Sequence, residues 1–188
     1  ADDRKYASDS RKWKDGVLAD GIYPRWNDSP LSELFRMKDI CIYGPGDNFS
    51  LEDGHVIPSL IHRTYLAKQN NTDLEVWGDG SALREFIYSK DVANITSKLL
   101  YDTDFKGNII VSNPEEVSIK QLVELIAETM EFKGKIKWLT DKPNGQLRKP
   151  SSIEKLTEVL GPQQFVSLRF GLAKTIEWFE RNYPNVRK

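Results

Sequence analysis

Four side chains in this sequence are of types that do chemistry. His55 titrates near neutral pH, which suits a group that donates or accepts a proton. Arg63 and Arg84 carry guanidinium forks that can hold two phosphate oxygens at once, and Lys149 offers a single ammonium. From the residues alone, the alternative is a structural histidine at the start of a helix and three exposed surface charges.

Composition disfavours several other kinds of chemistry. Two His and one Cys leave little for a zinc site, and Cys41 has no second cysteine for a disulfide. A net charge of −1 gives no basic surface for nucleic acid. No apolar run approaches the roughly 20 residues of a membrane helix, and no signal-peptide pattern opens the sequence. We therefore expect a cytoplasmic protein with no metal, membrane or nucleic-acid partner.

The hydrophobic pattern divides the chain near residue 41. Residues 1–41 are rich in polar residues and show no sustained period beyond a short helix expected over 32–37. No glycine-rich phosphate loop occurs there, because Gly16 and Gly21 lack the preceding strand and following helix that such a loop requires. From residue 40 onward, strands alternate with helices, which indicates an α/β fold with at least part of the sheet parallel.

The expected elements beyond residue 40 follow from periodicity and from helix caps. Ser89 is expected as an N-cap, and Ser118 with Gln121 forms a capping box at the start of a second helix. Strands are predicted over 40–43, 73–77, 84–88, 108–111 and 135–139, and helices over 54–68, from 89 on, 118–130, 151–160 and 170–182.

Four stretches, in this order, resemble the GDP-L-fucose synthase family of the extended short-chain dehydrogenases/reductases, within the NAD-dependent epimerases and dehydratases. They are Tyr43-Gly-Pro-Gly-Asp-Asn-Phe49, Glu52-Asp-Gly-His-Val-Ile-Pro58, Val76-Trp-Gly-Asp-Gly80 and Leu83-Arg-Glu-Phe-Ile-Tyr88. The resemblance implies that residues 42–188 are the C-terminal substrate-binding part of such a fold. Fringe strands of the Rossmann sheet would be present and most of the Rossmann domain absent, while residues 1–41 show no resemblance.

The resemblance also implies roles for individual residues. The family epimerises GDP-4-keto-6-deoxy-D-mannose and then reduces it with NADPH, so its members are both isomerases and oxidoreductases. His55 matches the general acid, Arg84 and Arg63 match positions that hold the diphosphate or sugar, and Lys149 is similar to one that contacts the nucleotide. Trp77 matches an aromatic residue that lines the substrate, with core packing as the alternative.

Other family features are not recognisable in this sequence. No Tyr is followed by Lys four residues later, and the catalytic Ser and Cys are not found. Asp47 and Asn48 are interpreted as turn residues. We therefore expect a truncated, catalytically incomplete form with no identifiable NADP site. Apolar surface left uncovered on Ile95 and Val111 would favour self-association, for example as a homodimer.

Two other functions stay open. The chain could be a non-catalytic protein that binds or senses nucleotide sugars, or an epimerase or dehydratase for another nucleotide sugar.

Overall fold

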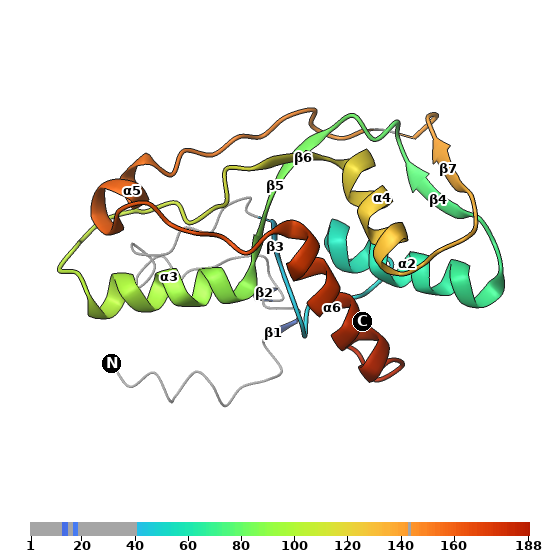
Figure 1. Cartoon of the computed structure of the whole chain (residues 1–188), viewed down its shortest axis with the longest axis horizontal. Coiled ribbons are helices and arrows are strands. Elements are labelled where there is room, and N and C mark those ends of the chain that lie inside the picture. The colour runs from blue at the N-terminus through green and yellow to red at the C-terminus, as the bar shows by residue number, and fades with distance from the viewer. Residues whose placement is uncertain (1–12, 15–16, 19–40, 143) are drawn as a thin grey trace. The chain divides into compact units, whose positions relative to one another are not determined.

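The computed structural model describes residues 13–14, 17–18, 41–142 and 144–188, and they fall into two compact units. One unit comprises 1–36 and 106–109, where β1 (Trp13–Lys14) pairs with β2 (Val17–Leu18) as an antiparallel hairpin. The other comprises 37–105 and 110–188 and contains the remaining helices and strands of the described residues, as coloured along the chain in Figure 1. The helix predicted over 32–37 lies outside the described residues.

Two small sheets form the β-structure of the larger unit. In the first, β3 (Cys41–Tyr43) runs parallel to β5 (Leu83–Tyr88), and β6 (Glu116–Ser118) pairs with the other edge of β5 in antiparallel fashion. In the second, β4 (Leu74–Trp77) runs parallel to β7 (Ile136–Leu139). The parallel pairs confirm the predicted mixed α/β class.

Five helices complete this unit: α2 (Val56–Asn70), α3 (Ser89–Tyr101), α4 (Ile119–Thr129), α5 (Glu154–Leu160) and α6 (Leu168–Asn182). The predicted capping box at α4 is present, since the Ser118 hydroxyl accepts from the Gln121 N–H while the Gln121 side chain accepts from the Ser118 N–H. Helix α4 contacts α2 on one side and α6 on another, and α6 in turn contacts β5. Figure 1 shows these three helices grouped beside the two sheets.

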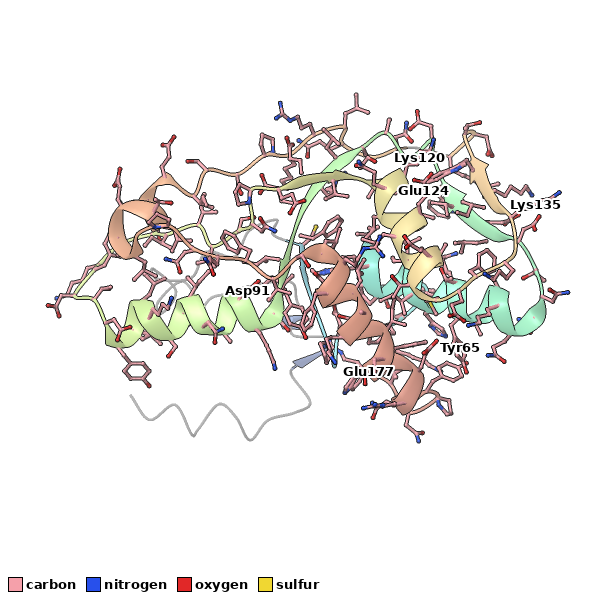
Figure 2. All side chains as sticks on the ribbon, in the orientation of Figure 1. Tyr65, Asp91, Lys120, Glu124, Lys135 and Glu177 are labelled. Atoms are coloured by element: carbon pink, nitrogen blue, oxygen red, sulfur yellow. The ribbon has the colours of Figure 1, made fainter. Side chains whose placement is uncertain are left out.

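An aromatic cluster joins α2, α6 and the loop before α2. Phe179 is fully buried, and its ring lies 4.7 Å from that of Phe49 and 5.4 Å from that of Tyr65. Tyr65, which is labelled in Figure 2, also packs against Tyr183, just beyond the end of α6. The buried His62 ring approaches Phe179 and binds the Phe49 carbonyl oxygen at 2.7 Å through Nδ1, which must donate because a carbonyl only accepts. The cluster thereby fixes the segment that leads to His55.

The structure corrects three predicted details. No strand forms over 108–111. Val111 is buried, being 7% exposed, so the apolar pattern there reflects burial and not strand pairing. Ser89 is the first helical residue of α3 instead of its N-cap, a position taken by Tyr88. Ile95 is also buried, so the expected uncovered surface is absent at both Ile95 and Val111. Self-association stays a prediction.

Candidate functional site

The five predicted site residues fall in two regions of the larger unit. His55 is the N-cap of α2, and Arg63 lies in the middle of that helix, with its side chain bonded to the loop before it. Trp77 ends β4 and Arg84 lies in β5, and the extended segment 144–151, here called the strap, runs beside both strands and carries Lys149. The second region therefore gathers three of the five residues.

His55 occupies the N-cap position of α2, with φ −63° and ψ 168°. Its ring is exposed and makes no capping hydrogen bond, so a structural capping role is not supported. The charge of His55 acts on the carboxyl group of Asp47. Burial raises the pKa of the Asp47 carboxyl, opposed by the Asn48 N–H, which donates to Oδ1 at 2.7 Å, and by His55.

The Asp47 side chain supports the turn that its sequence context predicts, because Oδ1 accepts from the Asn48 N–H. Its Oδ2 is buried with no hydrogen-bond partner in the part of the chain described. No local sequence pattern shows that this oxygen is buried.

Arg63 is engaged with its own surroundings. Its Nη2 donates to the Leu51 carbonyl at 2.9 Å and its Nε donates to the Ser59 hydroxyl at 3.3 Å. The side chain borders a groove of about 450 Å³ between α2 and β4, where Lys137 and Glu75 form an exposed ion pair at 2.8 Å. Arg63 therefore supports the loop before α2 with two of its five N–H donors.

The turn after β4 is built on Asn144 of the strap. The Asn144 side-chain oxygen accepts from the Asp79 N–H at 2.7 Å, and the Gly78 N–H donates to Leu139 of β7 at 2.9 Å. Gly78 has φ +80°, and a Cβ there would overlap the Asn144 side chain, so only glycine suits this close approach. Trp77, just before the turn, is 60% exposed, which is inconsistent with core packing.

Arg84 lies where the strap crosses β5. Its Nη1 donates to the Leu83 carbonyl at 2.7 Å, and its Nη2 would lie 3.7 Å from a Cβ placed on Gly145. The Leu83 N–H donates to the Leu147 carbonyl of the strap at 2.8 Å. The guanidinium is thus partly buried, held at one corner, and adjacent to the strap, which is a suitable position for binding an anion.

The strap has further attachments on both sides of Lys149. Arg148 forms a two-pronged ion pair with Glu116 of β6 at 2.7 to 3.0 Å, and the Ser151 N–H donates to Glu85 at 3.0 Å. The Arg148 guanidinium lowers the pKa of Glu116 through its hydrogen bonds. Lys149 is therefore placed by contacts with the sheet that contains Arg84.

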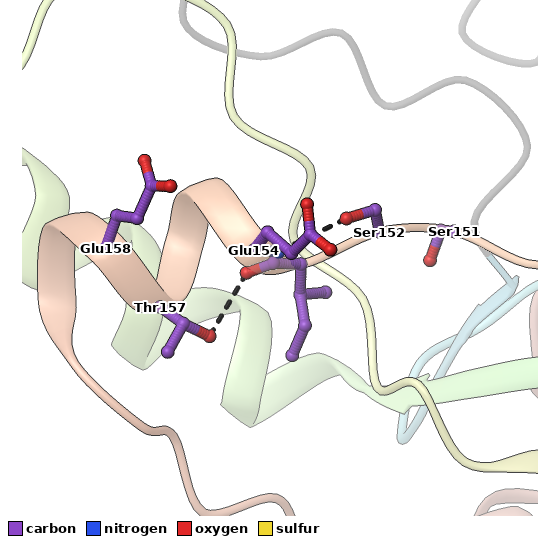
Figure 3. Close-up of a pocket in the computed structure, with 6 residues that line it drawn as sticks. Ser151, Ser152, Glu154, Thr157 and Glu158 are labelled. Carbon is purple, nitrogen blue, oxygen red and sulfur yellow. Dashed lines mark hydrogen bonds between the residues drawn. The ribbon is translucent and has the colours of Figure 1, made fainter.

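A hollow of about 600 Å³ lies over the start of α5, shown in Figure 3. Glu154 and Glu158 line it together with Ser151, Ser152 and Thr157, and the hydroxyls of Ser152 and Thr157 bond to nearby backbone atoms. Two carboxylates repel a diphosphate, so this hollow does not suit a nucleotide sugar. Trp77, Arg84 and the strap form the better candidate.

The residues present do not fit the diphosphate of a dinucleotide cofactor. Such a site needs a glycine-rich turn between a strand and the N-terminus of a helix. In residues 41–142 and 144–188, β5 leads directly into α3 at Ser89, with no glycine between them. A Cβ on Gly44, after β3, would overlap the Ser89 hydroxyl, so that glycine allows contact with α3. Over the same residues no helix is long and apolar enough to cross a membrane.

Several known proteins are similar to this chain in sequence. Residues 40–111 match the model of the NAD dependent epimerase/dehydratase family. The chain is 43% identical over 149 residues to GDP-L-fucose synthase of Dictyostelium discoideum, covering 78% of this chain and 47% of that protein. It is 40% identical over 145 residues to GDP-L-fucose synthase 1 of Arabidopsis thaliana, covering 77% and 45%.

Solved structures give the same result. The crystal structure of a GDP-L-fucose synthetase from Naegleria fowleri bound to NADP matches with a TM-score of 0.76 and 35% identity, over 79% of this chain and 45% of that one. Residues 40–111 are thus similar to the NAD dependent epimerase/dehydratase family, and the solved structure shares the fold of this part of the chain. The chain is similar to the GDP-L-fucose synthases named here, and it spans less than half the length of these curated relatives.

Proposed function

We propose that this chain supplies the GDP-sugar-binding region of a GDP-L-fucose synthase, an NADP-dependent epimerase and reductase. The observation that carries the proposal is that the Lys149-bearing strap is bonded both to the turn after Trp77 and to the start of β5 beside Arg84, in a segment similar to those enzymes. A guanidinium and an ammonium complement a diphosphate, and an exposed indole offers a flat surface to the base or sugar.

In the proposed reaction His55 acts as the general acid. Epimerisation beside a ketone removes a proton from one face of the carbon and returns one to the other face. An exposed histidine at an N-cap, with no capping bond to break, is available to deliver that proton. Asp47 would hold or exchange the proton of His55, and Arg63 would keep the loop that carries both in place.

NADP supplies the hydride in this type of enzyme, and the described residues do not form a site for its diphosphate. A second candidate function, nucleotide-sugar binding without turnover, is favoured by the sequence, in which no Tyr precedes a Lys by four residues.

Calorimetric titration of the chain with GDP-mannose, UDP-glucose and dTDP-glucose tests the proposal. We expect heat of binding for the GDP-sugar and at least tenfold weaker binding for the other two, since a base-specific site discriminates through paired polar groups. Equal affinity for the three would refute a GDP-specific site, and absence of binding to all three would refute the nucleotide-sugar function. Formation of GDP-L-fucose from the 4-keto sugar with NADPH, measured separately, distinguishes an enzyme from a binding protein.

A further inference from the structure

Glu85 is a buried carboxylate next to Arg84, and the site described above gives it no role. It lies in β5 and is 8% exposed. A buried carboxylate is costly unless hydrogen bonds compensate for its lost hydration. The hydrogen-bond donors to Glu85 therefore show which parts of the chain this side chain holds together.

Three donors from two distant segments meet this carboxylate. Oε1 accepts the Ser151 N–H at 3.0 Å. Oε2 accepts the Ser112 hydroxyl at 2.9 Å and also the Ser151 hydroxyl. Ser112 is 1% exposed, so the cluster is shielded from water on that side, and its hydrogen bonds are correspondingly strong. One side chain thus ties Ser112 and the end of the strap to β5.

The part of the strap from Leu147 to Ser151 is held at both ends by β5. The Leu83 N–H binds the Leu147 carbonyl, and Glu85 binds both the backbone and the hydroxyl of Ser151. Lys149 is midway between Leu147 and Ser151. An ammonium on a segment fixed at both ends loses less freedom when it binds an anion than one on a loose loop.

We propose that Glu85 is a positioning residue for nucleotide-sugar binding: by holding Ser151, it fixes the strap so that Lys149 and Arg84 face the same diphosphate. The inference rests on the proposed function, and it adds a specific physical task for a carboxylate that cannot itself contact an anionic ligand favourably. Its effect on affinity is transmitted through Lys149.

The experiment compares five proteins: the parent chain, Glu85→Ala, Glu85→Gln, Ser151→Ala and the matched control Ser152→Ala. Ser152 is exposed, and its hydroxyl accepts from the Glu154 N–H at 3.3 Å instead of joining the Glu85 cluster. Hydrogen exchange of the amides at 147–151 reports whether the strap is held, and calorimetry with GDP reports affinity. Each substitution is also made in a Lys149→Ala background.

We expect Glu85→Ala to speed exchange over 147–151 and to weaken GDP binding by no more than the loss of Lys149 itself, below about fivefold. Glu85→Gln should recover most of the affinity, because its carbonyl can still accept the Ser151 N–H while its NH₂ donates to the hydroxyls. Ser151→Ala should give a smaller change in the same direction, and Ser152→Ala none. With Lys149→Ala already present, Glu85→Ala should cause no further loss of affinity.

Several outcomes would overturn the inference. Faster exchange with unchanged GDP affinity would make Glu85 purely structural, and an equal loss in both backgrounds would show that it does not act through Lys149. If Glu85→Ala fails to fold, Ser151→Ala against Ser152→Ala decides, since unchanged exchange there refutes the attachment. If the parent chain binds no GDP, the proposed function is refuted, and so is the role of Glu85 in ligand binding. Hydrogen exchange then still decides whether Glu85 holds the strap.

Discussion

Replacing Arg84 by alanine should weaken GDP binding more than any other single change in the candidate site. The guanidinium has five N–H donors, of which one is given to the Leu83 carbonyl at 2.7 Å. The other four remain for a ligand, and the side chain is partly buried beside Gly145 of the strap. Those conditions favour a two-pronged contact with phosphate oxygens.

The expected loss of GDP affinity in Arg84→Ala follows from the number and burial of the hydrogen bonds that Arg84 can make to phosphate. Hydrogen bonds to a charged partner, lost from a partly desolvated place, cost about 1–3 kcal/mol. A loss of that size weakens binding about 5- to 150-fold. Lys149→Ala removes a single ammonium on the strap and should cost less than about 1 kcal/mol, or below about fivefold. Arg84→Lys should fall between the two, because lysine keeps the charge and loses the fork.

Calorimetry with GDP and with guanosine separates a phosphate contact from a general disturbance. Arg84→Ala should weaken GDP and leave guanosine nearly unchanged, since guanosine has no phosphate to hold. Thermal unfolding of each variant controls for damage to β5. Equal losses for GDP and guanosine, or an Arg84→Ala loss no larger than that of Lys149→Ala, would contradict the assignment.

Four further outcomes are expected. Because burial lowers the pKa of His62 in the folded chain, its stabilising effect should be complete above about pH 6.5 and decline below it, and His62→Gln should flatten this slope in denaturant titrations. Phe179→Ala should lower the free energy of unfolding by about 3–5 kcal/mol, measured by chemical denaturation, because the ring is fully buried. NADP titrated into the chain should show no low-micromolar binding, since no glycine-rich turn is offered to its diphosphate. In D₂O, the 4-keto sugar should gain no deuterium above background with the parent chain or with His55→Gln; exchange lost only in the variant would reveal a base that the sequence analysis missed.

Sequence periodicity was sufficient to predict most helices and strands of the larger unit. The helices at α2, α4, α5 and α6 and the strands at β3, β4, β5 and β7 lie within a few residues of their predicted bounds. It failed for β6 and for 108–111, both of which are short segments. A strand of three residues has too few alternations to show a period, and β6 exists because its backbone pairs with the outer edge of β5.

The candidate site was less predictable because its key contacts are distant in sequence. Arg84, Trp77 and Lys149 were found through motif resemblance, which identifies positions without saying what holds them. Glu85 was passed over, since a carboxylate within a strand pattern carries no signal of burial. Its link to Ser151 spans 66 residues, and no local pattern encodes such a pairing.

Binding and proton transfer depend on different parts of this molecule. The groups proposed to hold GDP are positioned by contacts within residues 77–151, through Asn144 on the β4 turn, Leu147 on β5 and Glu85 on Ser151. His55 instead projects from the N-cap of α2 with no hydrogen bond from its side chain to the helix, and its useful geometry is defined only by what lies opposite it. Epimerisation needs a base on that opposite face, whereas phosphate recognition does not. The same chain can therefore retain GDP-sugar recognition while its chemistry depends on groups beyond α2 and the strap.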